Sequence, residues 1–233
     1  MAVNLGDAAL ARLRAEEGLT LHRELGDPWG AAYAGFMLGH VVGDLPRAQQ
    51  LYEEGIRVFR ELGDEHSALL STRNLAWTYE ELGDLDRARA LHEENLDRAR
   101  SSSNARVEAS TLGILADYAR KEGRMQHALS MLRESLRIHR DVGDLLDTTV
   151  DLCRFAVILA SEGRTRTAAR LLASVDALGD EIGGRRARVT EMSEEPLKTI
   201  RAQLGEAAFA EAWEQGRKLT ADDAVALALD SLD

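Results

Sequence analysis

The feature that most constrains this chain is a pair of small residues that returns every forty positions. Glycines stand at one fixed interval, and an alanine follows each of them five positions later: Gly43, Gly83, Gly123 and Gly163, then Ala48, Ala88, Ala128 and Ala168. A period of this length is typical of repeat proteins, in which no single unit can bury its apolar face alone. The sequence therefore predicts a stack of similar units.

A second set of turn residues lies within the same period, at Gly63-Asp64, Ser103-Asn104, Gly143-Asp144 and Gly183-Gly184. Glycine suits the left-handed residue that closes a helix, and an Asp or Asn after it can cap the next helix. Each forty-residue unit is therefore expected to hold two helices. The predicted ranges, the first without a partner, are 7–25, 28–42, 45–62, 65–82, 85–101, 105–122, 125–142, 145–162 and 165–181.

The forty-residue period stops after residue 184, and a new apolar pattern follows. Ser193 and Pro196 indicate the start of a helix, because serine caps helices and proline favours the first turn. We expect residues 195–229 to form a helical hairpin, broken near 216–222, that buries Phe209 and Trp213 against the last repeat. The predicted domains are a repeat array over 1–184, with an unpaired N-terminal helix and four repeats, and a C-terminal helical cap over 185–233.

Charge and cysteine usage restrict the partners and the compartment. The chain has 29 Lys and Arg against 40 Asp and Glu, a formal net charge of −11, which disfavours direct binding to nucleic acid. One cysteine, Cys153, cannot form an internal disulfide, and the pattern predicts neither a leader peptide nor a membrane-spanning run. We expect a cytoplasmic chain that does not bind membranes.

Candidate catalytic and metal-binding residues have simpler structural explanations. The six histidines are scattered without metal-ligand spacing, and Cys153 shares an apolar helix face with Val150 and Val157. Acidic pairs such as Glu53-Glu54 recur with the repeat beside basic residues, as on a solvated helix face. We therefore predict no catalytic residue, no metal site and no cofactor.

The pattern Leu75-Ala76, Tyr79, Gly83 and Ala88 resembles the tetratricopeptide repeat, lengthened by about six residues per unit. This resemblance implies an all-α fold, a TPR-like α-solenoid of antiparallel helix pairs. In such arrays the first helix of each pair lines a concave face that binds proteins or peptides.

Longer segments resemble the C-terminal region of bacterial multidomain signal-transduction ATPases, including LuxR-type and antibiotic-regulator-type transcription factors. They are "RELGD" at 23–27 and 60–64, "EELGDLDRARALHEENL" at 80–96 and "LGEAAFAEAWEQGRKLTADDAVALAL" at 204–229. The resemblance implies a sensor or interaction module, with ATP hydrolysis and DNA binding upstream. We expect a fragment of a longer protein; a naturally short protein with an N-terminal capping helix is the alternative.

Two columns of residues are expected to face the groove, ten and six positions before each turn glycine. They read Tyr33, Arg73, Gly113 and Cys153, then Met37, Trp77, Asp117 and Val157. The groove should be aromatic at one end, charged in the centre and apolar at the far end. The predicted partner-binding residues are Tyr33, Met37 and Trp77 as apolar anchors, with Arg73, Asp117 and Arg120 orienting the partner by charge.

The sequence leaves two functions open. The first is a regulatory module that binds a protein or peptide segment, including another domain of its own parent protein. The second is a passive spacer or an oligomerisation scaffold, and in that case Trp77 could pack between neighbouring helices and leave the groove empty. A ligand-dependent change in melting temperature would distinguish a binder from a spacer.

Overall fold

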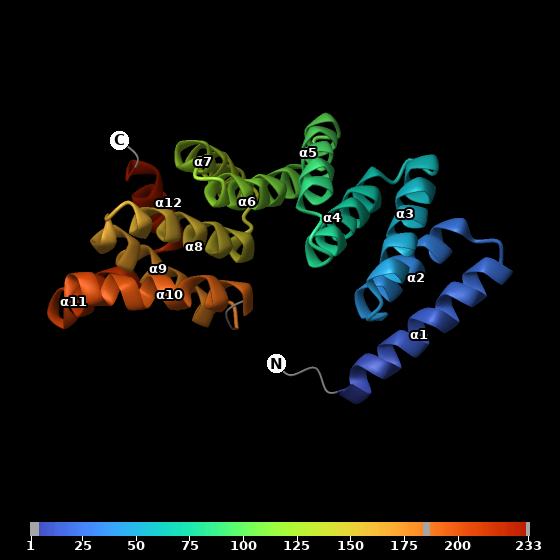
Figure 1. Ribbon diagram of the computed structural model, residues 1–233, viewed down its shortest axis with the longest axis horizontal. Helices are drawn as coiled ribbons and strands as arrows, with labels where there is room; N and C mark the ends of the chain where they lie inside the picture. Colours follow the sequence, from blue (N-terminus) through green and yellow to red (C-terminus); the bar gives the residue numbers. More distant parts are fainter. Residues whose placement is uncertain (1–4, 184–186, 232–233) are drawn as a thin grey trace. The chain divides into compact units, whose positions relative to one another are not determined.

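The computed structural model describes residues 5–183 and 187–231, and every element of regular structure in these ranges is an α-helix (Figure 1). The helices are α1 (Leu5–Glu24), α2 (Pro28–Val41), α3 (Leu45–Glu61), α4 (Glu65–Glu81), α5 (Leu85–Ser101), α6 (Ala105–Lys121), α7 (Met125–Asp141), α8 (Leu145–Ser161), α9 (Thr165–Glu181), α10 (Ala187–Leu204), α11 (Glu206–Arg217) and α12 (Ala221–Asp230). The predicted all-α solenoid of helix pairs is confirmed. The ends of α1–α9 agree with the predicted ranges to within two residues.

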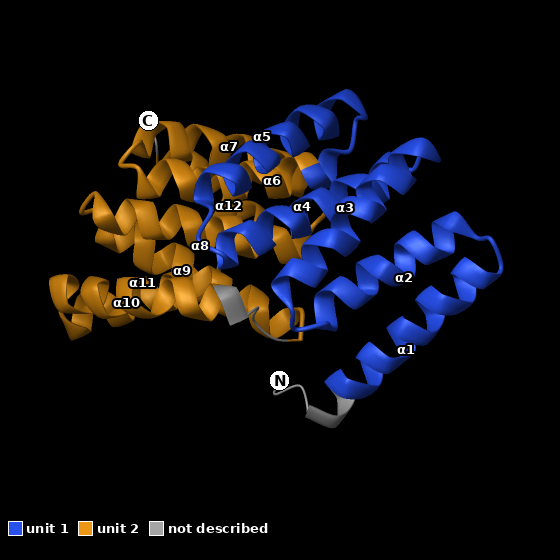
Figure 2. Ribbon diagram, turned by 45° about the vertical axis from the view of Figure 1, so that its right-hand side comes forward, with its two compact units in different colours: residues 1–107 blue, residues 108–233 orange. Residues whose placement is uncertain are grey.

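Residue contacts divide the chain into two compact units, residues 1–107 and 108–233, with the boundary inside α6 (Figure 2). Each unit is described by itself below. The predicted boundary after residue 184 lies outside the described residues, and the division into a repeat array and a cap stays a prediction.

The turns between helices follow one local design. Gly83 has a left-handed φ of 80°, and its N–H donates to the carbonyl of Glu80. The next residue, Asp84, accepts a hydrogen bond from the backbone N–H of Arg87 at 3.2 Å and so caps α5. Glycine occupies the left-handed position of most turns because a Cβ there would strain the backbone.

One turn departs from this design at Ser103. Its φ is 55°, and among the described residues it is the only one other than glycine with a positive φ. Asn104 still caps α6, since its side-chain oxygen accepts from the N–H of Val107 at 3.3 Å. The turn therefore keeps the common geometry at a cost in backbone strain.

The first unit packs consecutive helices through small residues. Ala48 and Ala88 are almost fully buried, and a Cβ at Gly39 of α2 would lie 2.6 Å from the ring of Tyr52 on α3. Tyr52 is 1% exposed, and this burial raises its pKa to about 12. The absence of a side chain at Gly39 thus allows an aromatic ring to fill the space between α2 and α3.

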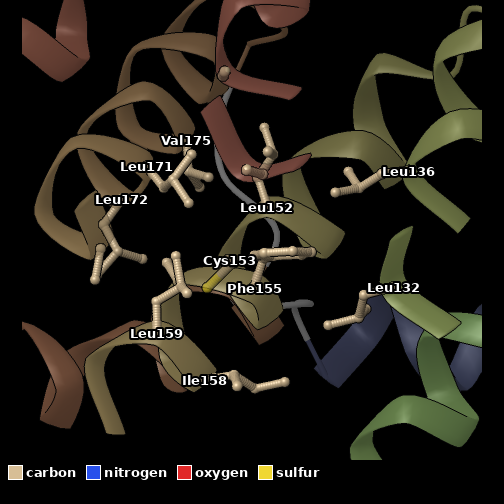
Figure 3. Close-up of a cluster of buried hydrophobic side chains, with 14 of the residues drawn as sticks. Leu132, Leu136, Leu152, Cys153, Phe155, Ile158, Leu159, Leu171, Leu172 and Val175 are labelled. Carbon is tan, nitrogen blue, oxygen red and sulfur yellow. The ribbon is translucent and has the colours of Figure 1, made fainter. Parts of the chain in front are cut away.

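The second unit contains the largest buried cluster, formed around α8 (Figure 3). Helices α6–α12 all contribute to it, and the residues labelled in Figure 3 come from α7, α8 and α9: Leu132, Leu136, Leu152, Cys153, Phe155, Ile158, Leu159, Leu171, Leu172 and Val175. Helices α10 and α12 both pack on α8 and α9, and α11 packs on α9. The C-terminal helices therefore complete the core of the last repeats.

The prediction for the C-terminal segment was partly wrong. Helix α10 does not begin at Ser193 or Pro196 but at Ala187, and it runs through Pro196. Burial of Val189, Ser193 and Ile200 along one face explains this, because tertiary packing offsets the hydrogen bond that proline removes.

The part of the segment before the expected break, predicted as one arm of the hairpin, consists of two helices, the end of α10 and α11. A left-handed Gly205 separates α10 from α11 and was not predicted, whereas the expected break lies between Arg217 and Ala221. Phe209 is buried as expected, and Trp213 is partly buried against the same cluster.

Replacing Ser103 with glycine should relieve the left-handed strain in the turn before α6. We expect Ser103→Gly to raise the free energy of unfolding by about 1 kcal/mol, measured by urea denaturation. Ser101→Gly, inside the last turn of α5, is the control and should lower it, because glycine is unfavourable in a helix. Equal effects of the two changes would contradict this explanation.

Helix α11 approaches α9 so closely that Gly216 leaves no room for a methyl group. A Cβ at this position would lie 2.2 Å from the carbonyl oxygen of Arg170 and 2.7 Å from the Cβ of Ala173. We expect Gly216→Ala to lower the unfolding free energy by about 2 kcal/mol, although alanine is the better helix former. Gly18→Ala in α1, where the nearest atom is 3.8 Å away, should be neutral or stabilising under the same denaturation assay.

Candidate interaction surface

The predicted apolar anchors are exposed side chains of the first unit. Tyr33 and Met37 lie one turn apart on α2 and are each 45% exposed, and Trp77 on α4 is 49% exposed. Arg73 precedes Trp77 by one turn of α4 and is partly buried. Trp77 is thus a half-exposed side chain rather than a fully buried one, and its role as an anchor for a partner stays a prediction.

Trp29 extends this surface and was not among the predicted site residues. It precedes Tyr33 by one turn, is 42% exposed and stacks on the Tyr33 ring with centroids 5.2 Å apart and planes 7° apart. Its indole Nε1 donates to Asp64 at 2.8 Å, and Asp64 caps α4. We call Trp29, Tyr33 and Met37 the α2 row. Their spacing of four residues was the sequence signal that could have identified Trp29.

Neighbouring aromatic rings of α2 and α3 pack beside Tyr33 of the α2 row. Phe36 lies 6.2 Å from Tyr33 and 6.1 Å from the buried Tyr52, measured between ring centroids. His40 packs edge-on against Phe36 at 4.6 Å, and its Nδ1 lies 2.8 Å from the Phe36 carbonyl oxygen. These contacts fix the rings before any partner binds, which lowers the entropy lost on binding.

The surface beneath Tyr33 is closed. A cavity of only about 20 Å³ remains between α2, α3 and α4, lined by Tyr33, Phe36, Phe59, Ser67 and Leu70. This volume is close to that of one water molecule. The α2 row is therefore suited to contact with a macromolecular surface rather than to enclosure of a small molecule.

The position equivalent to Tyr33 is buried in the second unit rather than exposed. Cys153 of α8 is fully buried, and its Sγ lies 3.8 Å from the carbonyl oxygen of Val189 on α10. Val157, the equivalent of Met37, is partly buried. The far end of the groove, predicted to be apolar, is thus covered at Cys153 by the chain's own helix α10, while the burial of Cys153 on an apolar helix face is as expected.

The remaining two predicted residues, Asp117 and Arg120, belong to the second unit. The carboxylate of Asp117 is 14% exposed, lies 2.9 Å from Nε of Arg154 and lies 4.0 Å from Nε of Arg120. Asp117 thus joins α6 to α8 through its ion pair with Arg154. A role for either residue in partner binding stays a prediction.

Arg154 also joins a buried polar network that the sequence analysis missed. Its NH1 donates to Asp151 at 2.8 Å, and the fully buried Asp151 accepts from the hydroxyl of Ser135 and lies 3.0 Å from Nδ1 of His139. A Cβ at Gly113 would lie 2.5 Å from NH1 of Arg154, so glycine provides the space. The network connects α6, α7 and α8.

Hydrogen bonds and neighbouring charges keep Asp151 and Arg154, the two central groups of this network, ionised. Burial alone raises the pKa of Asp151, but the hydrogen bonds from His139 and Ser135 and the charges of Arg154 and His139 outweigh it and lower the pKa. Burial lowers the pKa of Arg154, but the carboxylates of Asp117 and Asp151 outweigh burial, so the pKa is raised overall. The arrangement satisfies buried charges and does not present a reactive group to solvent.

The comparison with protein families assigns residues 30–101 to the tetratricopeptide repeat. This range runs from the first turn of α2 to the end of α5 and includes Tyr33, Met37 and Trp77. Tetratricopeptide repeats are generally non-catalytic modules that bind proteins or peptides. A comparison with curated protein sequences gives no match.

Solved structures share the fold at low sequence identity. The crystal structure of BtubC (BKLC) from P. vanneervenii matches with a TM-score of 0.71 at 16% identity, over 96% of this chain and 92% of that chain. A crystal structure of a putative kinesin light chain from Podosopora anserina, with nearly identical TPR-like repeats, has a TM-score of 0.50 at 19% identity over 95% and 97%. The fold of this chain is therefore that of a tetratricopeptide-like solenoid.

Two further observations concern the described residues alone. No three His, Cys, Asp or Glu side chains in these ranges converge in a way that could hold a metal ion. None of the described helices combines the length and the apolar character needed to cross a lipid bilayer.

Removing the charge of Asp151 should destabilise the second unit, because the buried Arg154 would lose one of its two carboxylate partners. We expect Asp151→Asn to lower the unfolding free energy by about 3 kcal/mol at pH 7, measured by chemical denaturation. Asp141→Asn, at a carboxylate that is 67% exposed, should change it by less than about 0.5 kcal/mol.

The effect of Asp151→Asn should also depend on pH. Because folding lowers the pKa of Asp151, its contribution to stability is complete above the unfolded pKa near 3.8 and is lost as the pH falls through the lower folded value. The difference between the two proteins should therefore shrink below about pH 4. A difference that stays constant down to about pH 2 would contradict the ionised state of Asp151.

Proposed function

We propose that this chain is a non-catalytic module that binds a protein or peptide segment on the face formed by α2 and α4. Tyr33, Met37 and Trp77 act as apolar anchors, and Arg73 orients the partner by charge. The observation that carries this proposal is the α2 row, whose three large side chains are 42–45% exposed while two of them, the rings of Trp29 and Tyr33, stack on each other.

The energetics of exposure support a binding role. Large aromatic side chains with few rotatable bonds dominate binding energies at protein interfaces, since little entropy is lost when they are covered. Trp77, on the neighbouring first helix, adds a further exposed ring at 49%. The exposed rings of Trp29, Tyr33 and Trp77 thus lie on the first helices of two successive pairs. Single exposed apolar side chains are usual on a protein surface, whereas a group of large ones is typical of an interaction site.

The covered position on α8 provides a second argument. Cys153 occupies the place in its repeat that Tyr33 occupies in α2, and helix α10 packs over it. The backbone of a first helix in this fold can therefore accept another helix at that position. At α2 the corresponding side chain is large, aromatic and exposed, which supports a partner supplied from outside the first unit.

A passive spacer or oligomerisation scaffold is the alternative function. A spacer has no use for a preorganised aromatic row, whereas a scaffold would cover the row with a second copy of the chain. The two functions differ in measurable ways, since a scaffold changes its oligomeric state when Tyr33 is replaced and a peptide binder does not.

The setting that we propose is a larger bacterial signalling or transcriptional regulator in the cytoplasm. The segments "RELGD" and "EELGDLDRARALHEENL" support this setting by their resemblance to such regulators. The formal net charge of −11 supports a module that does not itself contact DNA.

Peptides selected from a displayed library on the full chain provide the test. For such a peptide, we expect Tyr33→Ala and Trp77→Ala each to weaken binding by about 2 kcal/mol, roughly thirtyfold, with little change in melting temperature. Fluorescence anisotropy measures the affinity. Leu62→Ala, at an apolar residue that is 49% exposed just after α3, is the matched control and should bind normally.

Two results would overturn the proposal. In one, no selected peptide loses affinity when Tyr33 or Trp77 is replaced. In the other, gel filtration gives an oligomer for the unmodified chain and a monomer for the Tyr33 and Trp77 variants, which would assign the α2 row to self-association.

A further inference from the structure

A recessed surface lies in the C-terminal part of the second unit, between α10 and α11. It is a cleft of about 400 Å³ lined by Leu197, Lys198, Arg201, Phe209 and Trp213. Three of these residues come from α10 and two from α11. The cleft lies outside the α2–α4 face and does not depend on the function proposed there.

The floor of the cleft is apolar and aromatic. Phe209 is 6% exposed and stacks on Trp213, with ring centroids 5.4 Å apart and planes inclined by 24°. Leu197 is partly buried and packs against the same cluster. A cleft of this volume with an apolar floor has room for at least one large apolar side chain of a partner.

The rim of the cleft carries two positive charges on one side of α10. The guanidinium of Arg201 lies 4.5 Å from the centroid of the Phe209 ring, a cation–π contact that fixes its place over the floor. Lys198 precedes it by three residues and so lies on the same side of the helix. Both cations therefore stand beside the aromatic floor, on a chain that is acidic as a whole.

The carboxylates that now face these cations are replaceable. Lys198 lies 2.5 Å from Glu195 and Arg201 lies 3.7 Å from Glu206, and all four side chains are at least 55% exposed. Exposed pairs of this kind contribute little, since water and salt screen them. Carboxylates of a partner could take their place at small cost.

We propose that this cleft binds an acidic peptide segment in which carboxylates flank a large apolar side chain. The apolar side chain packs on Leu197, Phe209 and Trp213, and the carboxylates pair with Lys198 and Arg201. The acidic surroundings, which include Glu194, Glu195 and Glu206, favour a segment of a few charges over a polyanion such as nucleic acid.

The probe for this proposal is a fluorescein-labelled nonapeptide with glutamates on both sides of a central phenylalanine, measured by anisotropy against the full chain. We expect a dissociation constant in the range of about 10–100 µM at low salt, weakening as salt is added. Replacing either the glutamates by glutamines or the phenylalanine by alanine should weaken binding at least tenfold.

Variants of the protein distinguish binding at the cleft from non-specific attraction of the peptide to any positive charge. The double variant Lys198→Gln, Arg201→Gln should weaken binding at least tenfold with an unchanged circular dichroism spectrum, because both side chains are exposed. Lys218→Gln is the matched control: Lys218 is 70% exposed, pairs with Glu214 one turn earlier and does not line the cleft. Its affinity for the peptide should stay the same.

Three outcomes would overturn the proposal: no binding up to about 1 mM peptide, equal binding of the double variant, or equal binding of the glutamine peptide. Tighter binding of an oligothymidine than of the peptide, lost in the double variant, would also overturn it by assigning the cleft to nucleic acid. None of these outcomes bears on the α2 row, which the Tyr33 and Trp77 variants test separately.

Discussion

The close approach of helices at small residues is the constraint on which the rest of this structure depends. Ala48, Ala88 and Ala128 are at most 2% exposed, and at Gly216 even a methyl group would overlap the backbone of the facing helix. Large side chains are excluded from these lines of contact and must lie between helix pairs or point outward. The α2 row and the cleft between α10 and α11 consist of large side chains placed outside those lines.

The backbone repeats while the chemistry of equivalent positions does not. Ten residues before the turn glycine, α2 has an exposed aromatic ring at Tyr33, α6 has Gly113 beneath a buried arginine, and α8 has Cys153 beneath another helix. The repeat therefore fixes where these side chains project, and the individual residue decides whether the position binds, makes room or is covered. Function in such a chain must be sought in the columns that vary.

The sequence predicts the first nine helices closely because their ends depend on local chemistry, a left-handed glycine followed by a capping side chain. It fails at Pro196 and at Gly205, because burial of α10 against α8 and α9 decides the path of the chain there. Tyr33, Met37 and Trp77 could be chosen from register alone. The ion pair of Asp117 with Arg154 could not be predicted, because it joins residues 37 positions apart. The sequence did contain one sign of the buried network: Asp151 is charged, whereas the equivalent positions of the earlier repeats are Ala31, Ser71 and Thr111.

The ion pair between α6 and α8 has a consequence for how this array could have grown. Arg154 belongs to one repeat, while its partner Asp117 and the space at Gly113 belong to the repeat before it. A gene duplication of the later repeat alone would place a second such arginine against Val157 and Cys153, where it would keep Asp151 of its own helix but would find neither the carboxylate of the preceding repeat nor room. In this stretch the smallest unit that can be copied without loss is therefore two repeats, even though the backbone recurs with each one.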